Sequence, residues 1–149
     1  MKNMNESKKI AIVVSQFNNI VTDRLLSGAV QTLSQSEIDD GNIVVYQVPG
    51  AFEIPRIVNL VSQKDEYSGV IALGAVVKGQ TDHYQFISEA VTHQLVELAT
   101  TAPVPVLFGV LTTDNLEQAL NRAGGKAGNK GSECANALLR LLEVELQLN

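Results

Sequence analysis

The chain has 149 residues, of which 45% are hydrophobic and 18% charged, a balance typical of one globular domain that excludes intrinsic disorder. Eleven Lys and Arg stand against 16 Asp and Glu, and the net charge of −5 argues against a nucleic-acid partner. The single Cys excludes an internal disulfide and a four-cysteine zinc site, and favours a cytoplasmic protein. Residues 1–9 form a polar arm without the apolar stretch of a signal peptide. No apolar run approaches the roughly 20 residues of a membrane helix, so we expect no membrane association.

After this arm, short β-branched runs alternate with longer amphipathic stretches along the chain. Four runs predict strands, at 10–14, 43–48, 69–77 and 106–111. Five stretches with helical spacing predict helices, at 25–33, 54–61, 86–98, 115–122 and 131–146. We therefore expect one α/β domain over 1–149, a flavodoxin-like three-layer α/β/α sandwich with a four-stranded parallel sheet in the order 2-1-3-4. Within the helices, His93 is interpreted as a surface or core-edge residue and Cys134 as a packing residue.

The segment that follows the first strand is the first candidate for a site, because open parallel sheets bind ligands at the carboxyl ends of their strands. It reads Ser15-Gln16-Phe17-Asn18-Asn19. An aromatic ring among polar turn residues could stack on a planar ligand ring. A loop phenylalanine folded back onto the core is an equally good interpretation at this stage.

The second strand ends in a Pro-Gly turn, after which Ala51, Phe52 and Glu53 lead into a helix whose first N–H groups are unpaired. A carboxylate near a helix N-terminus complements the helix dipole, and this structural explanation of Glu53 is favoured when the segment is taken alone. The functional alternative is that the carboxylate and the exposed amides bind a polyol or the edge of a heterocycle.

The segment after the third strand, residues 74–84, is the richest in polar chemistry. A glycine followed by Gln80 and Thr81 at the start of a long helix offers backbone N–H groups to an anion. His83 lies in the first turn, where the dipole favours the neutral imidazole, and it could move protons beside a bound phosphate. The alternative is that Thr81 or Asp82 only caps the helix and His83 is solvated. The combination at a strand exit favours the functional interpretation.

Residues 122–131 hold three cations, Arg122, Lys126 and Lys130, among four glycines and no acid. Such a loop can wrap a phosphate, or it can be a solvated linker whose first glycines end a helix. A helix after the fourth strand runs back toward the opposite end of the sheet, so we expect this loop to lie far from His83. If both groups contact one phosphate, the site lies between two subunits.

Together these segments resemble the lumazine synthase family over about residues 10–143. Five motifs carry the resemblance: Ser15-Gln16-Phe17-Asn18, residues 48–55, residues 74–83, residues 108–113 and residues 123–131. Each motif alone is weakly specific, but five in order with matching spacing are very specific. Gln16, Lys78 and Gly125 depart from the common pattern, and none of them is assigned to proton transfer or to phosphate pairing.

The resemblance implies a transferase of the penultimate step of riboflavin biosynthesis. The family condenses 5-amino-6-(D-ribitylamino)uracil with 3,4-dihydroxy-2-butanone 4-phosphate, releasing phosphate and water to give 6,7-dimethyl-8-ribityllumazine. It uses no metal or organic cofactor. The expected partners of this chain are therefore two small-molecule substrates.

The resemblance also implies a role for each matching residue. The pyrimidine and ribityl subsite matches Phe17, Ala51, Phe52, Glu53, Ala75, Val76, Val77 and Phe108. The first of these would stack on the pyrimidine ring. Gln80 and Thr81 match the phosphate-binding amides, and His83 matches the general acid/base. Phe108 and Arg122 match residues lent by a neighbouring subunit, with Arg122 pairing with the phosphate.

In its assembly, the family implies a homopentamer with shared active sites, and twelve pentamers can build an icosahedral capsid of 60 subunits. Residues 123–131 carry no insertion relative to the capsid-forming pattern, which leaves pentamer packing sterically possible. The short polar arm offers little to add as a strand to a neighbouring sheet. Pentamer and capsid both stay open, and riboflavin synthase is a further partner that the resemblance allows.

Three other classes of protein share parts of this pattern. A receiver domain shares the architecture but needs an acidic cluster after the first strand, where this chain has Ser15 and Gln16. An archaeal-type riboflavin synthase would share the fold, but the motif from Gly79 to His83 argues against it. A shell-forming subunit without activity stays open, because assembly and catalysis would use the same interface.

Overall fold

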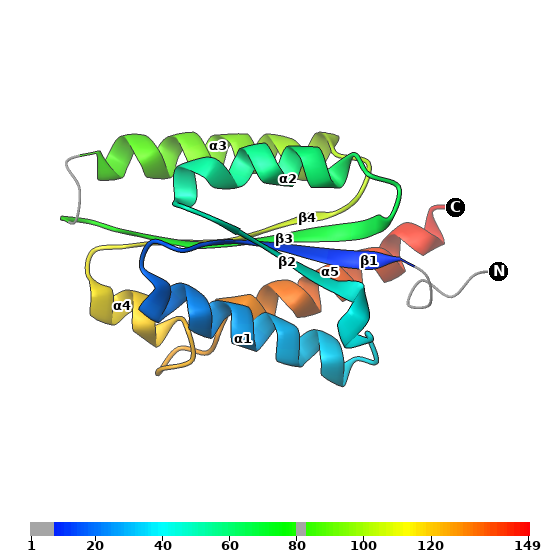
Figure 1. The fold of residues 1–149 in the computed structure, drawn as a ribbon, viewed down its shortest axis with the longest axis horizontal. Coiled ribbons are helices and arrows are strands. Elements are labelled where there is room, and N and C mark those ends of the chain that lie inside the picture. Colours follow the sequence, from blue (N-terminus) through cyan, green and yellow to red (C-terminus); the bar gives the residue numbers. More distant parts are fainter. Residues whose placement is uncertain (1–7, 80–82) are drawn as a thin grey trace.

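A four-stranded parallel sheet forms the centre of the computed structural model, which describes residues 8–79 and 83–149 (Figure 1). The strands are β1 (Lys9–Ser15), β2 (Ile43–Val48), β3 (Tyr67–Val77) and β4 (Val106–Thr113). Their spatial order is β2-β1-β3-β4, and all three pairings are parallel. The predicted fold class and strand order are confirmed.

Helices cover both faces of the sheet, as Figure 1 shows. One face carries α2 (Ile54–Ser62) and α3 (Tyr84–Thr101). The other carries α1 (Asn19–Gln35), α4 (Leu116–Asn121) and α5 (Lys130–Gln147). Two short 3-10 turns, η1 (Asp40–Asn42) and η2 (Ala51–Glu53), precede β2 and α2. Every predicted strand and helix is present, and none of the helices in the described residues is long and apolar enough to cross a membrane.

The core lies on both faces of the sheet because the β-branched runs are buried on both sides. Successive residues of β1 alternate between the two faces. Ile12 belongs to the core with Leu25 and Leu138 of the α1 and α5 layer, and Val13 to the core with Val58 of the α2 layer. This double burial leaves the strand ends and the loops beyond them as the places where polar side chains collect.

Candidate active site

A pocket of about 200 Å³ opens at the carboxyl ends of β1 and β3, beside the start of α2. It is lined by Phe17, Gly50, Ala51, Phe52, Glu53, Ala75, Val76, Val77 and Ile87. The predicted residues at three separate strand exits therefore share one cavity. The sequence did not assign Ile87 to the site, because its apolar side chain fits the helical pattern of α3 and carries no other signal.

The loop that carries Phe17 is fixed at one wall of this pocket. The backbone N–H of Phe17 donates a 3.0 Å hydrogen bond to the carbonyl of Pro49. Asn18 takes the left-handed conformation, with φ 64°, and its amide Nδ2 donates a 3.1 Å bond to the carbonyl of Ala75. The Phe17 side chain is 55% exposed, so the ring is available to a ligand and is not folded back onto the core.

The second wall is the turn η2, which the Glu53 side chain holds in place. Its Oε1 accepts a 2.9 Å hydrogen bond from the backbone N–H of Gly50, and Glu53 is itself the N-cap residue of α2. The carboxylate therefore has a structural contact within the turn. The same contact fixes the turn that presents Phe52, which is 65% exposed, to the pocket.

His83 is the N-cap residue of α3 and is exposed, next to the end of β3. Its ring centroid lies 6.4 Å from that of Phe86, with the two rings tilted. It precedes an 18-residue helix, so it stands at the positive end of the helix dipole. Two of the predicted phosphate-binding residues, Gln80 and Thr81, lie outside the described residues, and so does the alternative cap Asp82.

Phe108 does not line the pocket of its own chain. It is paired in register with Ala72, whereas Ala75 of the pocket is paired with Leu111. Three residues of strand correspond to roughly 10 Å along the sheet. The half-buried Phe108 ring packs instead against the core under α2 and α3.

Arg122 follows α4 on the opposite face of the sheet, so the structure does not bring it to this pocket either. The expectation that its loop lies at the far end of the sheet is wrong. Helix α4 is only six residues long and ends beneath the carboxyl end of the sheet (Figure 1). The sheet itself separates Arg122 from His83.

The basic loop between α4 and α5 is an ordered turn. The N–H of Lys130 donates to the carbonyl of Arg122 over 2.8 Å, and Gly124 and Gly128 are joined by a second 2.8 Å backbone bond. Gly124 has φ 106°, a conformation that favours glycine, and it lies two residues after Arg122, which is the C-cap residue of α4. Arg122, Lys126 and Lys130 form no ion pair with any residue that the structure describes. Their charge is thus available to an anionic ligand.

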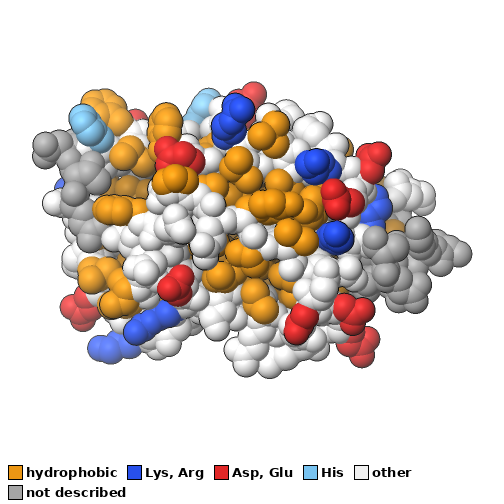
Figure 2. All heavy atoms as spheres, viewed as in Figure 1, with side chains coloured by type: hydrophobic (Ala, Val, Ile, Leu, Met, Phe, Trp, Pro, Cys, Tyr) orange, Lys and Arg blue, Asp and Glu red, His pale blue; other side chains and the backbone are white. Residues whose placement is uncertain are grey.

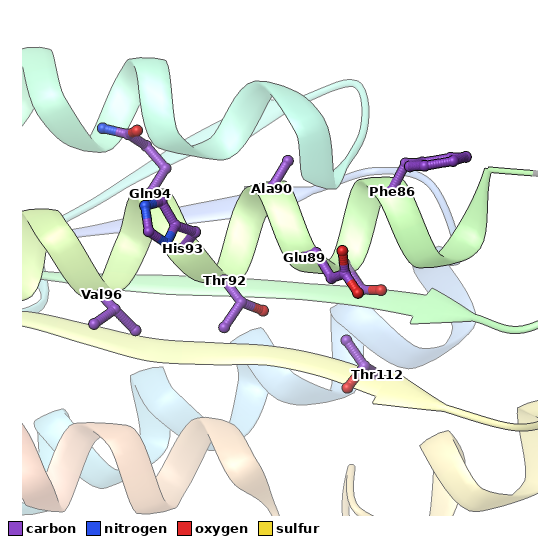
Figure 3. A pocket seen from close by; sticks show the side chains of 9 residues that line it. Phe86, Glu89, Ala90, Thr92, His93, Gln94, Val96 and Thr112 are labelled. Carbon is purple, nitrogen blue, oxygen red and sulfur yellow. The ribbon is translucent and has the colours of Figure 1, made fainter.

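A wide, shallow hollow lies along the outer side of α3 (Figure 3). It has a volume of about 1010 Å³ and is lined by Phe86, Ser88, Glu89, Ala90, Thr92, His93, Gln94, Val96 and Thr112. This α3 groove includes His93, which is exposed as predicted. No cluster of three or more His, Cys, Asp or Glu side chains that could hold a metal ion occurs among the described residues.

Comparison with known proteins gives one consistent result over nearly the whole chain. The family model described as 6,7-dimethyl-8-ribityllumazine synthase matches residues 7–145. A protein of that name from Pediococcus pentosaceus is 56% identical over 137 residues, covering 92% of this chain and 88% of its own. Its namesake from Levilactobacillus brevis is 55% identical over 95% of this chain and 90% of its own. A third, from Leuconostoc mesenteroides, is 46% identical over 95% and 91%.

Proposed function

The chain belongs to the 6,7-dimethyl-8-ribityllumazine synthase family, and from this premise we propose that it condenses 5-amino-6-(D-ribitylamino)uracil with 3,4-dihydroxy-2-butanone 4-phosphate. The observation that carries the proposal is the pocket in which Phe17 meets residues 51–53 and 75–77. An exposed aromatic ring, backbone groups of a helix start and an apolar strand end suit a planar heterocycle with a polyol chain.

Proton transfer is the chemistry that such a condensation requires of the protein. Imine formation, loss of phosphate and ring closure each move protons between carbon, nitrogen and oxygen. His83, the N-cap residue of α3, is the residue to which the proposal assigns this proton transfer. Holding the two substrates in register supplies much of the remaining rate.

The phosphate subsite belongs to two subunits in this proposal. A pocket of about 200 Å³ is smaller than the roughly 300–1,000 Å³ of most small-molecule sites. Phe108 and Arg122 lie away from it in the same chain, while the family pattern places both residues at the site. A neighbouring subunit that supplies them would enlarge the pocket and bring a guanidinium to the leaving phosphate. Gln80 and Thr81 would offer backbone amides from the first subunit.

The surface supports a homo-oligomer. Phe86 is 72% and Val96 54% exposed along the α3 groove, and such apolar exposure favours contact with another protein surface. A second apolar area crosses the middle of the face in Figure 2, where a groove of about 470 Å³ runs beside β2. Because β2 is an edge strand of the sheet among the described residues, this side is also open to a partner. We propose a homopentamer, with the 60-subunit capsid and a complex with riboflavin synthase as its larger assemblies.

The direct test is incubation of the purified protein with both substrates while the absorbance and fluorescence of the lumazine product are followed. Omission of either substrate is the control. Lumazine formation supports the proposal. Intact oligomers that form no lumazine would favour the shell-forming subunit without activity, and consumption of added lumazine would favour a riboflavin synthase.

A further inference from the structure

One side chain, that of Asn129, ties the basic loop to helix α1. Its amide Nδ2 donates a 3.0 Å hydrogen bond to the carbonyl of Arg24, 105 positions away in the chain. Its Oδ1 accepts a 3.1 Å bond from the backbone N–H of Ser132 and so caps α5. A single amide group therefore joins the start of α5 to the middle of α1.

The two helices approach closely enough for this contact because each has a glycine at the crossing. A Cβ on Gly28 of α1 would overlap the amide atoms of Asn129. A Cβ on Gly131 of α5 would overlap the backbone carbonyl of Leu25. The Oγ of Ser132 donates a further 3.0 Å bond to the carbonyl of Gly28. The Asn129 amide is thus held in a tightly packed seam.

Asn129 also forms the base of the loop that carries Arg122. Ala123 and Asn129 form an antiparallel bridge, and the neighbouring pair is closed by the 2.8 Å bond from the Lys130 N–H to the Arg122 carbonyl. The backbone of Arg122 is therefore directly beside the bridge formed by Asn129, whose side-chain amide binds α1. A displacement of the Asn129 backbone would therefore displace the backbone of Arg122.

We propose that Asn129 is a positioning residue for the phosphate subsite: its amide holds the base of the basic loop against α1 and fixes where Arg122 projects toward the neighbouring subunit. This rests on the proposed function, because it needs Arg122 to meet the phosphate. A guanidinium binds phosphate through paired hydrogen bonds of fixed geometry, so its placement decides its strength. A displacement of about 1 Å can cost up to about a hundredfold in rate.

The informative variant is Asn129→Ser, which is neutral and keeps a good N-cap oxygen but cannot reach the Arg24 carbonyl. We expect the KM for the butanone phosphate to rise about tenfold, the size of one weakened charge-assisted hydrogen bond. The KM for the pyrimidine should stay within about twofold of wild type, since the pocket around Phe17 is untouched. Asn129→Thr is a second neutral capping variant if the serine protein does not fold.

The matched control is Ser132→Ala, which removes another hydrogen bond of the same seam and leaves the loop base and the backbone N–H in place. It should lower the melting temperature without changing either KM. The last experiment introduces Asn129→Ser into the Arg122→Ala protein and measures both KM values again. If Asn129 acts through Arg122, the KM for the butanone phosphate does not rise further in this double variant, because the effects of coupled residues are not additive.

The outcomes separate this inference from the function on which it rests. If Arg122→Ala raises the KM for the phosphate substrate and Asn129→Ser does not, the positioning role is overturned and the phosphate site stands. A rise of both KM values together, or a further rise in the Arg122→Ala background, also overturns it. If Arg122→Ala itself leaves the KM unchanged, the proposed phosphate role of Arg122 fails, and the positioning role fails with it.

Discussion

At the scale of single residues, the site depends on side chains whose backbone is fixed by short hydrogen bonds. Phe17 is held through its own N–H and through the amide of Asn18, and Phe52 through the cap that Glu53 forms. A substrate can therefore meet rings that are already in place, which lowers the entropy cost of binding. His83 differs from them, because the role proposed for it is to move protons.

Replacement of His83 by alanine tests that role. We expect kcat to fall by about 10²–10⁴-fold, the usual contribution of a positioned acid/base, while the KM for the pyrimidine stays within about twofold. Part of the rate survives because substrate alignment survives. Steady-state kinetics measures both constants, and added imidazole should restore part of the lost rate. A variant with wild-type turnover would remove His83 from the mechanism.

Cys134 gives a prediction about reactivity. The thiol is buried in the core between the sheet and α5, and burial raises its pKa from 9.0 to about 11. At pH 8 the thiolate population is then about a hundredfold below that of an ordinary cysteine. The native protein should react slowly with a disulfide reagent at pH 8, and the protein in denaturant quickly. Equal rates in the two states would contradict the burial.

The same shift predicts how stability depends on pH. The pKa of the Cys134 thiol is higher in the folded state than in the unfolded state, so the protonated thiol favours the folded state. This contribution to the free energy of unfolding is complete below pH 9. That contribution is lost as pH rises from 9 toward 11. Cys134→Ala should therefore flatten the fall in melting temperature over this range, and an unchanged slope would contradict the linkage.

At the scale of elements, the seam between α1 and α5 is a closely packed helix contact. Gly131→Ala would place a Cβ against the Leu25 carbonyl, which is backbone and cannot turn aside. We expect a loss of about 1–3 kcal/mol, measured by denaturant unfolding at fixed protein concentration. Gly41→Ala is the matched control, since a Cβ there meets no atom within 4 Å. Equal effects of the two changes would contradict the tight seam.

The elements also show which parts of the structure the sequence could predict. The apolar runs around Ile12 and Ile71 predicted buried parallel strands, and the segments after the first two strands, with Phe17 and Glu53, do line one pocket. The contact between Asn129 and Arg24 could not be foreseen, because it joins residues 105 positions apart and local patterns carry no record of such packing. The bounds of α4 were predicted to within one residue at each end, 115–122 against Leu116–Asn121, but the path of the chain was not, because a helix of six residues is too short to run back along the sheet.

At the scale of the whole molecule, the proposed completion of the site by a neighbouring subunit determines how copies would associate. Repeating a head-to-tail contact produces a closed ring when the rotation closes. Sedimentation should therefore find a ring or an assembly of rings, with pentamer and capsid differing about twelvefold in mass. A fully active monomer would contradict the shared site.

Mixed oligomers test the shared site most directly. Phe17→Ala and Arg122→Ala subunits, assayed at a butanone phosphate concentration at which each alone has little activity, are mixed in equal amounts, dissociated and reassembled, and the mixed state is verified by mass spectrometry. A site built from Phe17 of one subunit and Arg122 of the next is intact at about a quarter of the interfaces of a random ring, so about a quarter of the wild-type activity should return. No recovery in verified mixed oligomers would place the whole site within one subunit and contradict the account.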